Sequence, residues 1–179
     1  MDIKSAQQDV RSTFLRGSIG QTVSGLIWLV SAILGIWVSE RFAILVLVLA
    51  GMFIFPLTQL TLRLLGRPGG LPNGHPMNAL AMQVAFIVPL SLPVIGAASL
   101  YNINWFYPAF MLIVGVHYMP FIFLYGMWEF GALAALLIGG SVAFGMLLSD
   151  SFITGGWFTA IVLLLFAVLV QFTPRLMKK

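Results

Sequence analysis

The stretch "TGGWFTAIVLLLFAVLVQFT", residues 154–173, decides the fold because it runs its whole length without a charged side chain. A helix needs about 20 predominantly apolar residues to cross the hydrocarbon core of a bilayer. Only helices and closed barrels satisfy their own backbone hydrogen bonds in lipid. The stretch is almost continuously apolar and lacks the alternation of a barrel strand. It therefore predicts a transmembrane helix.

The rest of the chain has the same character. It is 60% hydrophobic and only 8% charged, whereas soluble domains carry roughly a quarter charged residues. Such a composition cannot cover a water-facing surface, so we expect an all-α integral membrane protein with six transmembrane helices in one domain, residues 20–173. The other five spans are expected at about 20–38, 42–64, 79–100, 106–127 and 130–149.

Two short segments flank this domain. In residues 1–19, Ile3, Ala6, Val10 and Phe14 recur at helical spacing, which predicts a short amphipathic helix at the membrane interface. A frayed polar terminus is the alternative. Residues 174–179 form a basic tail that is expected in the cytoplasm.

The placement of charge predicts the orientation. With both termini in the cytoplasm, all of the nine Lys and Arg residues except Arg41 lie inside, as the positive-inside rule requires. Trp37, Trp105 and Trp157 then fall at the outer boundary and Trp128 at the inner one, where indole rings prefer to sit. The basic ends are expected to face anionic lipid headgroups and not nucleic acid.

Small residues recur at every fourth position of the fifth span: Gly131, Ala135, Gly139 and Ala143. Such a face lets another helix approach closely, which is how helices associate in lipid. We expect a helix-packing face, either within the chain or against a second copy or a partner membrane protein.

Polar residues and prolines single out spans two to four. Pro56, Pro89, Pro93 and Pro120 predict kinks there, and kinked helices at mid-depth often line transporter cavities. The expected cavity-lining residues for a small ligand of unknown identity are His117, Tyr118, Gln59 and Gln83. His117, near the midplane, would serve as a hydrogen-bond donor or a titratable gate. The alternative is that these side chains only form hydrogen bonds between helices.

Several functions are disfavoured. The chain has no cysteine and two histidines, so no metal site and no cofactor are expected. No charged side chain falls at mid-depth, which disfavours an ion-coupled pump. Glu129 lies about 18 Å along the helix from His117, too far for a direct acid–base pair. A non-enzymatic role is therefore favoured.

Two motifs carry a family resemblance. "HPMNALAMQ" at 75–83 and "HYMPFIFLYGM" at 117–127 resemble a family of small bacterial polytopic membrane proteins that has no assigned function. The resemblance implies a bacterial inner-membrane location and transfers no activity. In size and span number the chain is also similar to the membrane components of vitamin transporters that bind substrate. Its aromatic, carboxylate-poor interior is similar to that of the translocator protein family, which has five spans.

We expect one of three functions, and we rank them in the following order. The first is binding or translocation of a small neutral or weakly polar molecule through a cavity between helices two to four. The second is assembly with a partner through the small-residue face of the fifth span. The third is modification of a lipid within the membrane.

Overall fold

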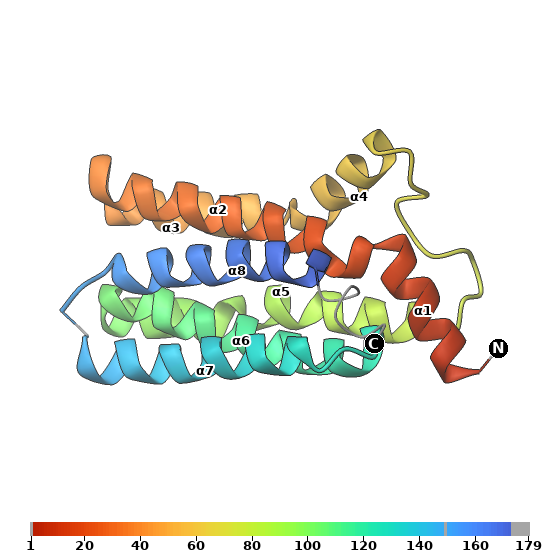
Figure 1. Cartoon of the computed structure of the whole chain (residues 1–179). Helices are drawn as coiled ribbons and strands as arrows, with labels where there is room; N and C mark the ends of the chain where they lie inside the picture. Colours follow the sequence, from red (N-terminus) through yellow and green to blue (C-terminus); the bar gives the residue numbers. More distant parts are fainter. Residues whose placement is uncertain (1, 149, 173–179) are drawn as a thin grey trace.

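The computed structural model describes residues 2–148 and 150–172, and every regular element there is a helix (Figure 1). The predicted all-α class is confirmed. The residues of the basic tail, 174–179, lie outside the described part. In chain order the elements are α1 (Ile3–Thr13), the short 3₁₀ helix η1 (Leu15–Gly17), α2 (Ser18–Trp37), α3 (Glu40–Gly51), α4 (Ile54–Leu64), α5 (Asn78–Tyr101), η2 (Ile103–Trp105), α6 (Phe106–Tyr125), α7 (Glu129–Leu147) and α8 (Thr154–Phe172).

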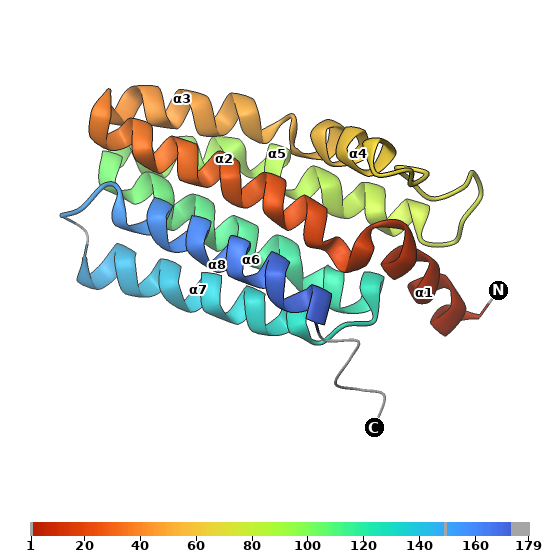
Figure 2. The same ribbon diagram turned by 45° about the horizontal axis from the view of Figure 1, so that its top comes forward.

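The long helices lie side by side in a bundle, with α1 set at an angle across one end (Figures 1 and 2). Among the described residues, five helical segments are long and apolar enough to cross a membrane, and α3 with α4 supplies a sixth if the bent pair is one span. The most extensive packing is between α6 and α7 and between α2 and α8. The ends of the helices agree with the predicted spans to within a few residues.

The second predicted span is broken. The axes of α3 and α4 differ by 55° across the break at Met52 and Phe53. Pro56 explains its position, because a proline removes the hydrogen bond to the carbonyl four residues earlier and its ring clashes with that carbonyl. That carbonyl belongs to Met52. Pro89, Pro93 and Pro120, in contrast, lie inside the continuous helices α5 and α6.

The helix α5 is the least enclosed of the long helices. It packs against α6 and η2 and makes few contacts with α3 or α4. A seam between the α3–α4 pair and α5 therefore runs along the bundle, and both hollows described below lie on it.

The helices α6 and α7 approach closely at Gly115. A Cβ at this position would lie 2.8 Å from Ile138 Cγ1 and 3.2 Å from the Ala134 carbonyl oxygen. The α7 face in contact with α6 therefore includes Ala134 and Ile138.

Of the predicted small-residue face, Gly131 lies against α6, since a Cβ there would be 3.1 Å from Ile122 Cδ1, and Ala143 is half-buried. Ala135 and Gly139 are exposed, and a Cβ at Gly139 would meet nothing within 4 Å.

Gly115→Ala should destabilise the protein by about 1–3 kcal/mol, because the added methyl group presses on the backbone of α7. Gly139→Ala is the matched control and should leave stability unchanged or raise it, since the position is open. Unfolding of the detergent-solubilised protein by heat or denaturant measures both. Equal stability of the two variants would contradict the close approach.

Candidate ligand-binding cavity

A cavity of about 270 Å³ lies between α2, the α3–α4 break, α5 and α6. Most of its wall is apolar, with Trp28, Leu47, Phe55, Val88, Leu92 and Phe110 among the lining side chains. None of the lining residues is charged. The polar lining groups come from α2, α4 and α6, and they include two of the four residues expected from sequence.

His117 lines the cavity from α6 and is half-buried. Its Nδ1 lies 2.9 Å from the Val84 carbonyl oxygen of α5. A carbonyl only accepts, so Nδ1 carries the proton and donates it. In the neutral ring Nε2 is then an acceptor, and it makes no hydrogen bond within the described residues. The hydrogen-bond donor that the sequence predicts on His117 is thus bound to Val84, and the nitrogen of His117 that stays free is an acceptor.

Tyr118 is the second expected residue that lines the cavity. Its hydroxyl donates to Gln21 Oε1 at 2.8 Å, and both side chains are buried. Ser24 lies beside the same hydroxyl. The Nε2 amide group of Gln21 makes no hydrogen bond in the described part of the chain. The cavity therefore has a free donor on α2 and a free acceptor on α6.

The other two expected residues lie away from this site. Gln83 is exposed on α5, and Gln59 lies on α4 beside Gly69 and Gly70 of the following loop. Neither lines the cavity. Thr58, one position before Gln59, lines the cavity and donates to the Ile54 carbonyl at 2.7 Å.

Sequence reasoning missed Gln21 and Ser24, although a signal was present. The buried polar side chains of α2 recur at intervals of three or four residues and their multiples: Ser18, Gln21, Ser24 and Ser31. This is the spacing of one helix face. A polar face on a helix that is otherwise apolar indicates a side turned toward other helices.

The helix α1 covers the end of the bundle where Phe14, Gly17 and Tyr125 line the cavity. Gln7 Nε2 donates to the Phe123 carbonyl at 2.6 Å, and Arg11 donates to the Tyr125 carbonyl. These carbonyls belong to the last turn of α6, where the end of the helix favours a cation, and the Phe123 carbonyl also accepts the Gly126 N–H.

Gly126 permits this contact. It ends α6 in the left-handed conformation, with φ of 60°, which only glycine adopts without cost. A Cβ there would also lie 2.9 Å from Arg11 Nη1. The predicted amphipathic segment is thus a helix docked on α6, with Ala6 and Val10 buried.

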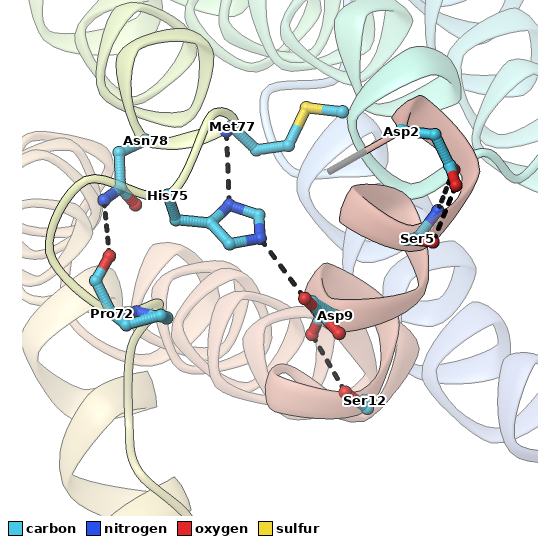
Figure 3. Close-up of polar contacts among 8 residues, drawn as sticks. All are labelled: Asp2, Ser5, Asp9, Ser12, Pro72, His75, Met77 and Asn78. Atoms are coloured by element: carbon cyan, nitrogen blue, oxygen red, sulfur yellow. Dashed lines mark hydrogen bonds and ion pairs between the residues drawn. The ribbon is translucent and has the colours of Figure 1, made fainter.

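A second contact joins α1 to the loop before α5 (Figure 3). His75 Nδ1 accepts the Met77 N–H at 3.2 Å, and its Nε2 lies 3.6 Å from Asp9 Oδ2. The His75 side chain is 2% exposed, although it sits in a loop. At the start of α1, the Ser5 N–H donates to the Asp2 carboxylate, which lowers the pKa of Asp2.

The link between α1 and α2 is strained. Leu15 and Arg16 have φ of 48° and 57°, which is uncommon for residues with a side chain. The Arg16 side chain holds the link in place, donating to the Val170 carbonyl at 2.9 Å and pairing with Glu129 at 3.5 Å. Glu129 is therefore engaged with Arg16 and not with His117.

Comparison with known proteins assigns the chain to a family. A family model matches residues 3–173. The chain belongs to DUF7010, a family of unknown function. This confirms the expected membership of an uncharacterised family. The DUF7010 match begins at α1, so the covering helix is included along with the cavity helices. No curated protein and no solved structure matches the chain.

His75→Ala should release α1 from the loop. It removes the pair with Asp9 and leaves the Met77 N–H without its acceptor, a loss of about 1–3 kcal/mol. Hydrogen exchange of residues 3–13 should become about tenfold faster while exchange in α7 stays constant. Asn73→Ala, an exposed change in the same loop, is the control. Unchanged exchange in α1 after His75→Ala would contradict the anchoring role.

Proposed function

We propose that this protein is a multi-pass protein of the bacterial inner membrane that binds or passes a small neutral or weakly polar molecule. The proposal takes α3 and α4 as one bent span, which makes six, and places both termini in the cytoplasm. The distribution of basic residues supports this orientation. The ligand would occupy the cavity between α2, α3–α4, α5 and α6.

One observation carries the functional part: Gln21 Nε2 and His117 Nε2 are unpaired groups in a largely apolar cavity. Both residues line the cavity and neither atom is fully enclosed by protein, so a molecule in the cavity can accept a hydrogen bond from Gln21 and donate one to His117. The absence of charge from the lining favours a neutral ligand. The volume exceeds that of the ~150 Å³ cavities that bind benzene.

A pair of probes tests the polar end of the cavity. Benzyl alcohol can donate to His117 Nε2 and accept from Gln21, whereas benzyl methyl ether lacks the donor. Benzyl alcohol should therefore raise the melting temperature of the detergent-solubilised protein more than the ether does, because a ligand that binds only the folded state stabilises it. In His117→Phe, which keeps the ring but removes the acceptor, this difference should disappear.

The control is Val168→Phe, which adds bulk at an exposed position of α8 outside the cavity. It should keep the difference between the two probes. Equal responses of the unmodified protein to alcohol and ether, or a difference that survives His117→Phe, would remove His117 from ligand recognition.

Assembly through α7 is a second candidate, and the exposure of Ala135 and Gly139 favours it. A second helix could approach closely along this open face. Gly139→Leu should then shift the protein toward smaller assemblies in mild detergent, as measured by light scattering, while Val168→Phe should not. An unchanged mass for Gly139→Leu would count against this role.

A further inference from the structure

A second hollow lies on the same seam. It is lined by the ends of α3 and α5 that lie away from α1, as the ribbon in Figure 1 shows for these helices. Its volume is about 670 Å³. One wall is a single face of α3, with Arg41, Ile44 and Val48 at intervals of three and four residues. The opposite wall is α5, from Leu92 to Tyr101. We call this hollow the α3–α5 groove.

The α3–α5 groove is long, apolar and deep. From Leu92 to Tyr101 the helix rises about 14 Å, close to half of the ~30 Å hydrocarbon core. Its floor includes Ile95 and Phe106, each 1% exposed. A Cβ at Gly96, on its α5 wall, would meet nothing within 4 Å. The groove thus has the length of an acyl chain from one leaflet.

The mouth of the groove carries hydrogen-bond donors. Arg41, the Tyr101 hydroxyl and the side-chain nitrogen Nδ2 of Asn102 lie there, and none of these three groups has a hydrogen-bond or ion-pair partner within the described residues. Glu40 precedes Arg41 but does not line the groove, because one residue turns the helix by about 100°. Arg41 is therefore the only charged residue among those that line the groove.

Aromatic residues mark the same end as an interfacial zone. Trp37 and Tyr101 are 81% and 85% exposed, and the Trp105 ring meets that of Tyr101 edge-on. Exposed indole and phenol rings gather at the headgroup level of membranes. A charged mouth at headgroup level above an apolar groove has the polarity of a phospholipid.

We propose that the α3–α5 groove binds a glycerophospholipid with a net negative headgroup. One acyl chain lies between α3 and α5, and the phosphate accepts hydrogen bonds from Arg41, Tyr101 and Asn102. The inference rests on the proposed membrane placement and is independent of the ligand in the cavity that Gln21 and His117 line. Leu92 lines both hollows, so the bound chain would border that cavity.

The test uses the full chain in nanodiscs made of equal amounts of phosphatidylglycerol and phosphatidylcholine. Native mass spectrometry then measures the lipid that stays bound to the protein after the protein is released from the nanodisc. Phosphatidylglycerol should be enriched about fivefold, the factor expected for one basic residue near an anionic lipid. Arg41→Gln should abolish the enrichment. Gly96→Leu should displace bound lipid of both kinds, because its side chain fills the groove.

Matched changes control for charge and bulk. Lys4→Gln removes one positive charge at the opposite end of the bundle, and Val168→Phe adds bulk on α8; both should keep the enrichment. Ser99→Leu fills the groove at a second position should Gly96→Leu fold poorly. Equal retention of the two lipids, or enrichment that persists in Arg41→Gln, would overturn the proposal. The response to benzyl alcohol in the same variants shows separately whether the cavity that Gln21 and His117 line is intact.

Discussion

Two buried hydrogen bonds between α2 and α6 are the interactions on which the rest of the structure depends. The Tyr118 hydroxyl bonds to Gln21 at 2.8 Å, and the Tyr107 hydroxyl bonds to Ser31 at 2.6 Å. The backbones of α2 and α6 approach each other at few points, since α2 packs on α8 and α6 packs on α7. Long tyrosine side chains therefore bridge the two helix pairs. Tyr118 and Gln21 supply polar groups of the cavity wall, whereas Tyr107 and Ser31 are fully buried and do not line the cavity.

The break between α3 and α4 completes this arrangement. A straight second span would run parallel to α2, whereas the 55° bend places Gly51, Met52 and Phe55 on the cavity wall. The weak packing of α5 against the bent pair leaves the opposite side open along the seam. The cavity lies beside the break, the α3–α5 groove lies along α3, and both are on the seam between the bent pair and α5.

Much of the fold could be predicted from the sequence, because long apolar runs leave the backbone few choices in lipid. The same reasoning estimates the depth of a residue along its helix but not the direction in which its side chain points. His117 and Tyr118 line the cavity, while Gln59 and Gln83, at a depth that also suits a cavity, do not. The helix α5 has no polar face that would indicate its orientation. The helix α4 has a polar side with Gln59 and Arg63 four positions apart, but that side does not line the cavity.

The docking of α1 could not be predicted for a different reason. Gln7 and Arg11 bind backbone carbonyls of α6, and such groups exist in every helix. The sequence offers no pattern that pairs them with one helix end over another. The close approach of Gln7 and Arg11 to Gly126 is visible only once the two elements are in place.

The central claim is that a neutral molecule pairs with both His117 and Gln21. An experimental density map of the full chain in lipid nanodiscs, with ordered solvent visible, tests it most directly. We predict non-protein density within hydrogen-bonding distance of His117 Nε2 and of Gln21 Nε2 at the same time. Side chains packed together at this place, with His117 and Gln21 paired only to protein groups, would contradict it.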